Sequence, residues 1–493
     1  MHASISLDLS NTVGTIDPRI YSSFIEHMGR AVYTGIYEPG HPAADPQGLR
    51  QDVLELIRPL QLPLIRYPGG NFLSGYRWED GIGPKESRPV RLDLAWQALE
   101  PNTFGTDEFL DFCAKAGTAP MMGVNLGTGT PQDAANLVEY CNFKEGTFQS
   151  DRRIKNGFKE PFNIKTWCLG NEMDGPWQIC AKTAEQYAWS ARESAKMMRL
   201  VDPSIELVAC GSSHRDMPTF GTWERTVLRE CWEYIDYISL HQYYRCDDGD
   251  IPTLLARNMQ MDGFIQEVNA ICREIQAEKG SEKSVFLSFD EWNVWYHWQQ
   301  QGKSSPPWTV GRRLEEEAYN FADALAVGCM INTLINNADT VKIACLAQLV
   351  NALAAIMTEP GGKAWAQTIY HPFALAAQNG RGTALAADTQ CGSYSCPISD
   401  HTPWLDVSAL LSPDRKYVTL FIINRNLTED IPCRLQLKDH LIHISRHCAL
   451  AGFPLEAVNS ADSSPVMPFD LPLPQTDTVI LPAASWNMLQ LPL

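Results

Sequence analysis

Between about residues 20 and 375, short and almost continuously apolar runs alternate with longer amphipathic stretches such as residues 183–202. Such runs are typical of parallel strands that are buried on both faces. Seven of them occupy residues 62–70, 119–127, 164–172, 205–213, 234–243, 284–292 and 340–348. An eighth lies near "IYSSFIEH", residues 20–27. Eight strand–helix units over this length predict an α/β fold of the (β/α)8 type, a TIM barrel.

After about residue 375 the pattern changes to an alternation of apolar and polar residues, as in "YVTLFIINRN" (417–426), with Pro, Asp and Asn between the runs. This alternation is typical of antiparallel strands with one buried face. The segment "ASISLDLS" (3–10) alternates in the same way and no helix follows it. We therefore expect a catalytic barrel over residues 18–375. A jelly-roll-like β-sandwich is expected to combine residues 1–17 with residues 376–493, the N-terminal strand joining the C-terminal sheet.

The overall charge limits the possible partners. The chain has 493 residues, with 58 acidic against 40 basic ones and a formal charge of −18. That balance disfavours nucleic acid and anionic membrane surfaces. No export signal is apparent, and the longest apolar stretches fall short of a membrane span. We expect a soluble cytoplasmic protein whose 14 cysteines are mostly buried thiols. Cys391 and Cys396 could close a small loop, but a disulfide there is not expected.

Polar or ionisable residues stand at the ends of the predicted strands. In a barrel of this type, the carboxyl ends of the strands carry the catalytic groups. One such residue is more often a helix cap or a surface residue, but seven strands that end this way on one face predict a functional cleft. The residues are Glu26, His27, Arg66, Asn71, Asn125, Asn171, Glu172, His241, Tyr243, Glu291 and Gln348.

Two of these residues, Glu172 and Glu291, indicate the chemistry. Cleavage of a glycosidic bond requires a proton for the leaving oxygen and a carboxylate beside the anomeric carbon. Aromatic side chains nearby can stack on sugar rings, although a core position is at least as common for any one of them. These are Trp96, Trp177, Tyr243, Trp292, Trp295 and Trp298. No HExxH, P-loop or GxSxG pattern occurs, so neither a metal nor another cofactor is expected.

Several long motifs resemble glycoside hydrolase family 51, the intracellular α-L-arabinofuranosidases. They are "YSSFIEHMGRAVYTGIYEP", "RYPGGNFLSGYRWEDGIGP", "WCLGNEMDGPWQ", "SLHQYY" and "FDEWNVWY". The resemblance extends over essentially the whole chain, and no catalytic position departs from it. It implies that Glu172 is the acid/base and Glu291 the nucleophile. It also implies that a set of residues surrounds the furanose ring: Glu26, Arg66, Asn71, Asn171, His241, Tyr243 and Gln348. Trp96 and Trp295 are added as aromatic contacts to the substrate.

The resemblance predicts a retaining, exo-acting enzyme that releases terminal α-L-arabinofuranosyl residues from arabinoxylan or arabinan oligosaccharides. Endo-β-1,4-glucanase or β-xylosidase specificity is the alternative within the family, and a non-catalytic sugar-binding protein is a more distant one. A retaining enzyme should hold its two carboxyl groups about 5 Å apart. Linkage preference is expected to depend on the loops at 244–250 and 299–310, and the second loop is expected to be mobile. A hexamer is implied only by the resemblance.

Overall fold

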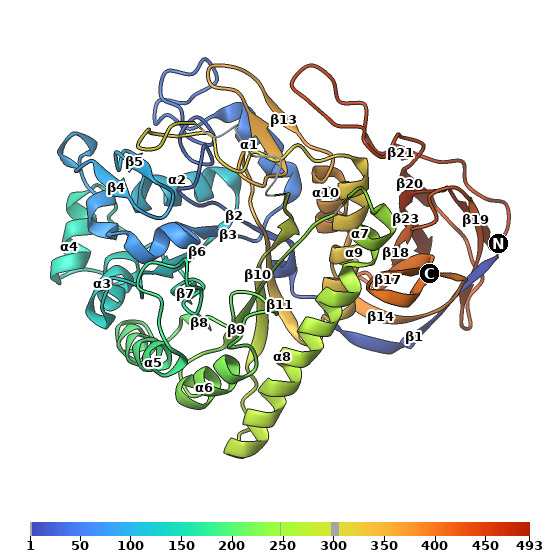
Figure 1. The fold of residues 1–493 in the computed structure, drawn as a ribbon, viewed down its shortest axis with the longest axis horizontal. Helices are drawn as coiled ribbons and strands as arrows, with labels where there is room; N and C mark the ends of the chain where they lie inside the picture. Colours follow the sequence, from blue (N-terminus) through green and yellow to red (C-terminus); the bar gives the residue numbers. More distant parts are fainter. Residues whose placement is uncertain (1, 247, 297–304) are drawn as a thin grey trace.

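The computed structural model describes residues 2–246, 248–296 and 305–493. Within these residues, eight parallel strands close a barrel in which neighbours in sequence are neighbours in space. The strands are β2 (Ser22–Phe24), β3 (Leu64–Tyr67), β6 (Ala119–Val124), β7 (Thr166–Leu169), β8 (Glu206–Ala209), β9 (Tyr237–Tyr244), β10 (Phe286–Val294) and β11 (Val341–Leu346). All eight coincide with the predicted apolar runs, although β9 and β10 extend slightly beyond them, and β2 closes the ring against β11. The barrel prediction is therefore confirmed (Figure 1).

Helices surround the barrel (Figure 1), and most of them bury apolar side chains. They are α1 (Gln51–Ile57), α2 (Thr106–Ala116), α3 (Pro131–Asn142), α4 (Phe148–Lys155), α5 (Ala184–Val201), α6 (Thr222–Cys231), α7 (Ile251–Ala256), α8 (Asn258–Lys279), α9 (Phe321–Asn336) and α10 (Tyr370–Asn379). Helix α5 begins at a capping box, in which Gln186 N donates to Thr183 Oγ1 and Thr183 N donates to Gln186 Oε1. No helix among the described residues is long and apolar enough to cross a membrane.

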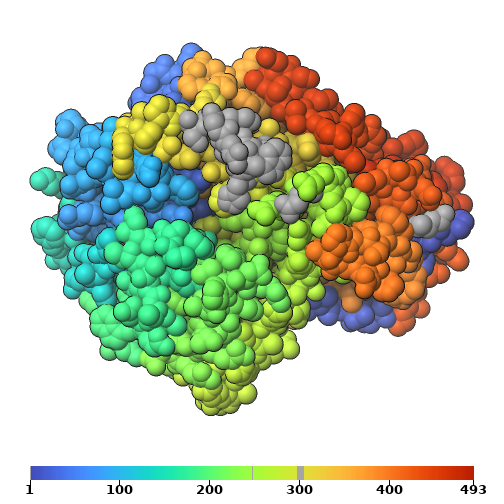
Figure 2. Space-filling model, in the orientation of Figure 1, coloured from blue at the N-terminus to red at the C-terminus, as the bar shows by residue number. Residues whose placement is uncertain are grey.

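The second domain is built on a large, mostly antiparallel sheet. Its strands are β1 (Ala3–Thr15), β14 (Thr383–Gln390), β17 (Leu405–Leu411), β18 (Tyr417–Asn424), β19 (Ile431–Leu437), β20 (Arg446–Leu450), β21 (Phe469–Asp470), β22 (Thr478–Leu481) and β23 (Ser485–Pro492). The N-terminal strand β1 lies between β14, to which it is antiparallel, and β19, to which it is parallel. The prediction that the N-terminal strand joins the C-terminal sheet is therefore confirmed. Figure 2 shows the corresponding blue atoms against the red and orange ones.

Short ribbons complete the described strands: β4 (Arg91–Asp93) with β5 (Ala98–Glu100), β12 (Ile356–Thr358) with β13 (Ala364–Ala366), and β15 (Ser393–Cys396) with β16 (Ser399–Pro403). Cys391, just before the last ribbon, and Cys396, the last residue of β15, are free thiols. Residues 299–304 of the loop predicted to be mobile lie outside the described residues, as does residue 247 of the other predicted loop.

Helix α9 packs between the barrel and the sheet domain (Figure 1). It is buried on all sides, because it contacts β10 and α8 of the barrel as well as β17 and β18 of the sheet. Its apolar sequence is therefore that of a core helix. Helix α10 runs through the predicted domain boundary at residue 375, and the next strand of the sheet begins at Thr383. We propose that the barrel domain ends with α10.

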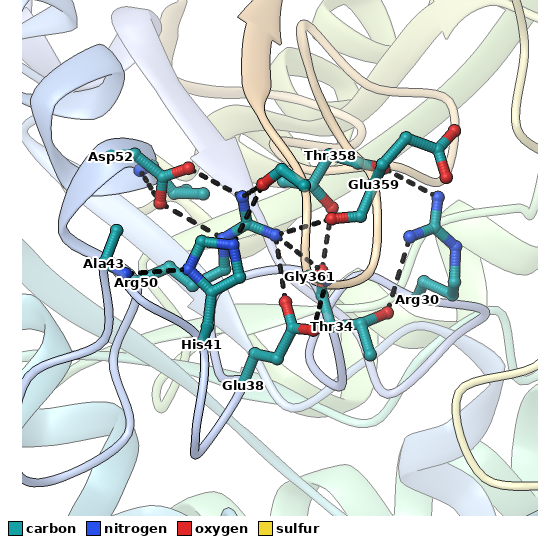
Figure 3. A network of polar contacts seen from close by, with 12 residues as sticks. Arg30, Thr34, Glu38, His41, Ala43, Arg50, Asp52, Thr358, Glu359 and Gly361 are labelled. Atoms are coloured by element: carbon teal, nitrogen blue, oxygen red, sulfur yellow. Dashed lines mark hydrogen bonds and ion pairs between the residues drawn. The ribbon is translucent and has the colours of Figure 1, made fainter.

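A buried arginine holds the loop after β2 to the β12–β13 ribbon (Figure 3). Arg50 is fully buried, and its guanidinium donates to Glu38 Oε2 at 3.0 Å and to Asp52 Oδ2 at 2.6 Å. It also donates to the carbonyl oxygens of Glu359 and Gly362. A buried charge is tolerated only when it is paired and hydrogen-bonded in this way.

Replacing Arg50 with methionine should therefore destabilise the protein strongly. The change leaves Glu38 and Asp52 without their cation, and we expect the free energy of unfolding to fall by about 3–5 kcal/mol. Urea unfolding of both proteins measures the difference. Arg434→Met is the matched control, since Arg434 is 60% exposed in its ion pair with Asp477 and should contribute only about 0–1 kcal/mol. Equal losses in the two variants would contradict the assignment.

Candidate active site

Strand β10 presents two consecutive carboxylates to the barrel interior, which a regular strand could not do. Ser288 lies opposite Ser239 of β9, whereas Glu291 lies opposite His241, so β10 has one extra residue over this interval. The same irregularity separates Phe289 from Trp292 in the pairing with β11. Such a bulge redirects side chains. As a result, Asp290 and Glu291 are both buried, and both contact residues of the neighbouring strand β9.

Glu291 is held from two sides. Arg66 Nη1 donates to Glu291 Oε1 at 2.6 Å, and the hydroxyl of Tyr243 donates to Glu291 Oε2 at 2.9 Å. Burial and the negative charge of Glu291 raise the pKa of Tyr243 well above its usual value, so Tyr243 remains a donor. The second guanidinium nitrogen of Arg66 donates to Asn171 Oδ1 at 2.7 Å. These contacts hold both oxygens of Glu291 in place.

Glu172 follows β7 in a left-handed backbone conformation, with φ of 47°. Non-glycine residues rarely adopt this conformation, and it is concentrated at functional sites. Trp177 Nε1 donates to Glu172 Oε2 at 2.8 Å, and His241 Nδ1 lies 3.0 Å from Glu172 Oε1. Burial raises the pKa of Glu172, and so does the charge of Glu291, against the hydrogen bonds from His241 and Trp177. This environment favours the protonated form of Glu172.

His241 and Asp290 connect Glu172 with the group around Glu291. The Nε2 atom of His241 lies 3.2 Å from Asp290 Oδ1, and Arg66 Nε lies 3.5 Å from Asp290 Oδ2. Burial alone would lower the pKa of His241, but the charge of Glu291 and the bonds to Asp290 and Glu172 raise it to about 10. Arg66 and His241 lower the pKa of Asp290 in spite of its burial. The imidazole is therefore a cation at neutral pH.

One oxygen of Glu172, one oxygen of Glu291 and a ring nitrogen of His241 all lie within 4.8 Å of one another. In geometric terms these atoms could hold a metal ion. A protonated imidazole is not a ligand, however, and Arg66 already neutralises Glu291, so the charges do not suit a cation. Oxygens of the two carboxyl groups that lie within 4.8 Å of each other instead agree with a retaining glycosidase, because an inverting enzyme needs roughly 6.5–9.5 Å.

A second polar cluster surrounds Glu26, at the end of β2. Phe72 N and Trp96 Nε1 both donate to Glu26 Oε1, at 2.9 and 2.8 Å, and Gln348 Nε2 donates to Glu26 Oε2 at 3.3 Å. Burial raises the pKa of Glu26 to about 8, and the charge of Glu291 adds to the effect. The carboxylate lies against Gly70, where a Cβ atom would collide with it. A side chain at position 70 would therefore displace the carboxylate of Glu26.

The two clusters face one cavity of about 910 Å³. Eight of the predicted substrate and catalytic residues line it: Glu26, Asn71, Trp96, Glu172, Tyr243, Glu291, Trp295 and Gln348. The remaining three, Arg66, Asn171 and His241, are buried beneath these residues and bonded to them. Asn171 Nδ2 donates to Asn71 Oδ1 at 3.3 Å. The cavity therefore brings all eleven predicted site residues into one connected group.

The comparisons with known proteins agree over nearly the whole chain. Residues 56–259 match the family model "Alpha-L-arabinofuranosidase 1 domain", and residues 290–485 match "Alpha-L-arabinofuranosidase C-terminal domain". The intracellular exo-α-(1→5)-L-arabinofuranosidase of Halalkalibacterium halodurans is 50% identical over 99% of both chains. The intracellular exo-α-(1→5)-L-arabinofuranosidase 1 of Bacillus subtilis is 50% identical over 94% of this chain and 93% of its own. A solved family 51 α-L-arabinofuranosidase from Bifidobacterium longum is 39% identical over 100% of both chains, with a TM-score of 0.95. The chain belongs to glycoside hydrolase family 51.

Several predicted contacts do not belong to this family 51 cavity. Trp292 is fully buried and packs against Phe373, so the prediction that it stacks on sugar is wrong. His27 bonds to Glu100 and Tyr67 in the core instead. Asn125 orders the loop after β6 by accepting from Gly127 N and Thr128 N. Trp298 lies outside the described residues.

Other residues of the site were missed by sequence analysis. Asp290 could have been suspected as a second carboxylate in "FDEW", but only the bulge turns it inward. The side of the cavity beyond Glu172 is formed by the loop after β8 and by helix α8, through Ser213, His214, Arg215, Gln260 and Phe264. Trp177 is 48% exposed there and stacks on His214 with the rings 6.0 Å apart. No motif marks the α8 residues, since they lie on an ordinary amphipathic helix.

Proposed function

We propose that this protein is a retaining, exo-acting α-L-arabinofuranosidase that removes terminal arabinofuranosyl residues from oligosaccharides. The observation that carries the proposal is the carboxyl pair: Glu172 and Glu291 lie within 4.8 Å, one among groups that favour protonation and the other beside Arg66. The family membership supports the sugar, since the relatives are named for this activity.

In the first step Glu291 attacks the anomeric carbon while Glu172 gives its proton to the leaving oxygen. Arg66 and Tyr243 hold the nucleophile in place for this attack. Formation of the glycosyl–enzyme removes the charge of Glu291, which lowers the pKa of Glu172. Glu172, left ionised by the first step, accepts a proton from the water that attacks the anomeric carbon; the bond to Glu291 breaks and the sugar leaves with retained configuration.

Recognition of the furanose hydroxyls is assigned to the second polar cluster and its neighbours. Glu26, Asn71 and Gln348 offer carboxylate and amide groups along one side of the cavity, and Asn171 lies between Arg66 and Asn71. Asn171 is proposed to bond the sugar 2-OH, a contact that strengthens in the transition state. Buried polar groups of this kind reject analogues that leave them unpaired.

The aglycone is proposed to occupy the side lined by Trp177, His214 and helix α8. This half of the cavity offers a stacking surface and polar groups, as an oligosaccharide chain requires. The names of the relatives suggest a (1→5) linkage. A solved structure named as a bifunctional glucanase-xylanase shares only 13% identity with the chain, which supports the fold alone.

An assay of 4-nitrophenyl α-L-arabinofuranoside, (1→5)-linked arabinobiose, 4-nitrophenyl β-D-xylopyranoside and a β-1,4-glucan tests the proposal. We expect efficient turnover of the first two, with retained configuration of the initial product by NMR. Turnover of the glucan or xyloside alone would replace the proposal with the other specificity of the family. Binding of arabinose without any turnover would point to a sugar-binding protein.

The pH profile should report the influence of His241 on Glu172. The imidazolium favours the ionised form of Glu172, so His241→Asn should raise the pKa of Glu172 further. Because the acid form then persists to higher pH, the alkaline limb of kcat/KM should move upward, whatever the loss in rate. His214→Asn is the control: His214 stacks on Trp177 without bonding to Glu172, and the limb should stay in place. An alkaline limb that moves downward in His241→Asn would contradict the arrangement.

A cytoplasmic location and a hexameric assembly complete the proposal. The location is supported by the word "intracellular" in the names of the relatives. A cytoplasmic enzyme would act on short oligosaccharides imported into the cell, and we propose that it takes part in this way in the breakdown of arabinan and hemicellulose. Assembly is supported by exposed apolar side chains that gather near the β4–β5 ribbon: Val90, Leu92, Leu94, Trp308 and Val310. Light scattering of the purified protein would distinguish a hexamer from smaller species.

A further inference from the structure

Residues 305–316, called the brace below, contact the turn that carries Trp96 and also the indole of Trp295. These two tryptophans line the cavity from different elements: Trp96 comes from the turn between β4 and β5, and Trp295 follows β10. The brace itself does not line the cavity. In Figure 2 the yellow atoms of this part of the chain lie beside the light-blue atoms of the β4–β5 part.

On the first side, the brace fixes the backbone that carries Trp96. Arg312 Nη1 donates to the carbonyl oxygen of Trp96 at 2.8 Å, and Trp308 N donates to Gln97 O at 2.7 Å. Leu99 N donates to Thr309 O at 3.3 Å. The indole N–H of Trp96 is already bound to Glu26, so both ends of this residue are held. The distance from Trp96 to the rest of the cavity therefore depends on the brace.

On the second side, the brace fixes the side chain of Trp295. Trp295 Nε1 donates to Glu315 Oε2 at 2.7 Å, and the indole meets the ring of Tyr243 edge-on, with the centroids 5.0 Å apart. Tyr243 in turn donates to Glu291. The carbonyl oxygen of Glu315 accepts from Leu353 N at 2.8 Å, and Leu353 lines the cavity as well. Glu315 thus holds two pieces of the wall next to Glu291.

The brace is anchored on its far side by ion pairs. Arg30 is buried and binds both oxygens of Glu316, at 2.6 and 3.0 Å, while it also donates to Thr358 O at 2.9 Å. Arg313 joins Glu316 to Glu359, at 2.8 and 2.6 Å. A bidentate arginine pair among buried groups keeps its geometry well. The brace can therefore hold both Trp96 and Trp295 in fixed positions.

We propose that the brace sets the width of the first subsite and thereby its selectivity for a five-membered furanosyl ring, with Glu315 and Arg312 as the positioning residues. The inference rests on the proposed function and adds a specificity determinant to it. Glu315 acts as a hydrogen-bond acceptor for Trp295, and Arg312 as a donor to the backbone at Trp96. Release of either tryptophan would widen the subsite and admit six-membered pyranosyl rings more readily.

The first test compares Glu315→Ala with Glu315→Gln. The alanine variant removes the acceptor, whereas the glutamine amide oxygen can still accept from the indole. Loss of one such bond corresponds to about tenfold in an equilibrium constant. We therefore expect Glu315→Ala to raise KM for 4-nitrophenyl α-L-arabinofuranoside about tenfold, with a smaller change in kcat. Its preference for this substrate over 4-nitrophenyl β-D-xylopyranoside should fall by a similar factor, and Glu315→Gln should restore both.

A double-mutant cycle separates positioning from a general loss of structure. In a Trp295→Phe background, Glu315→Ala should have almost no further effect on KM, because its effect passes through the indole. Glu274→Ala removes an exposed ion-pair partner of Arg225 on α8 and should leave every parameter unchanged. Acrylamide quenching of the Trp295 fluorescence, obtained by difference from Trp295→Phe, should increase in Glu315→Ala. This readout does not depend on any substrate.

Several outcomes would overturn the inference: unchanged KM and selectivity in Glu315→Ala, the same loss in Glu315→Gln as in Glu315→Ala, or additive effects in the cycle. If Glu315→Ala does not fold, Arg312→Met against Arg312→Lys provides the same comparison for Trp96, because lysine can still donate to its carbonyl oxygen. A wild-type protein that does not hydrolyse arabinofuranosides would instead reject the proposed function. The quenching result would then still decide whether Glu315 positions Trp295.

Discussion

Glu291→Gly is expected to abolish hydrolysis of arabinofuranosides, with kcat reduced about 10⁴-fold or more. The substitution removes the carboxylate that Arg66 and Tyr243 hold toward the cavity, and no other described carboxylate takes the same pair of contacts. Steady-state kinetics with 4-nitrophenyl α-L-arabinofuranoside measure the loss. Circular dichroism and calorimetric binding of L-arabinose check that the fold and the first subsite remain.

Azide provides the chemical control for this variant. It fits the space left by the missing side chain and attacks the anomeric carbon directly, so the product should be an arabinofuranosyl azide of inverted configuration. The role of Glu291 as nucleophile predicts this product together with recovered turnover. Residual activity above about one tenth of the wild-type value, or an azide of retained configuration, would assign the nucleophile to another residue.

Glu172→Ala is expected to discriminate sharply between leaving groups. General acid catalysis contributes about 10²–10⁴-fold, and it matters most when the departing oxygen is a poor leaving group. We expect a loss of this size in kcat/KM for methyl α-L-arabinofuranoside and arabinobiose. The loss for 2,4-dinitrophenyl α-L-arabinofuranoside should be much smaller, because the nitrophenolate needs no proton. A series of aryl arabinofuranosides gives the dependence directly.

The second step of the reaction provides a separate check on Glu172. Without a general base, the glycosyl–enzyme should accumulate from activated substrates and produce a burst of nitrophenolate. Added azide should relieve the block and give an azide of retained configuration, the opposite outcome from Glu291→Gly. Equal losses for good and poor leaving groups, with no burst, would remove Glu172 from the acid/base role.

The sequence was informative about the site because barrel geometry turns a one-dimensional pattern into a three-dimensional one. Parallel strands place their carboxyl ends at one face, so polar residues at the ends of the apolar runs converge there. Glu26 and Gln348 come from different runs and bond to each other for this reason, and so do Arg66 and Asn171. The N-terminal strand was also predictable, because its alternation matched that of the last domain.

Side-chain direction was less predictable wherever it depended on a partner strand. Trp292 is adjacent to Glu291 in sequence but points into the core, whereas Asp290 points toward His241. The extra residue in β10 decides both directions, and it exists only in the register with β9 and β11. A period-of-two pattern contains no information about such a bulge.

By itself, then, the sequence determined the eight strand–helix units, the sheet domain and the two glutamates, since these depend on periodicity and on strand order. The tertiary structure alone decided the surroundings of the glutamates. It brings one oxygen of Glu172, one oxygen of Glu291 and a ring nitrogen of His241 within 4.8 Å of one another. It also sets the contacts of Asp290 and the hydrogen bond between Glu315 and Trp295. The physical reason is that each of these contacts joins residues from different elements. Strand register, burial and the packing of distant segments determine these contacts, and a local sequence pattern predicts none of the three.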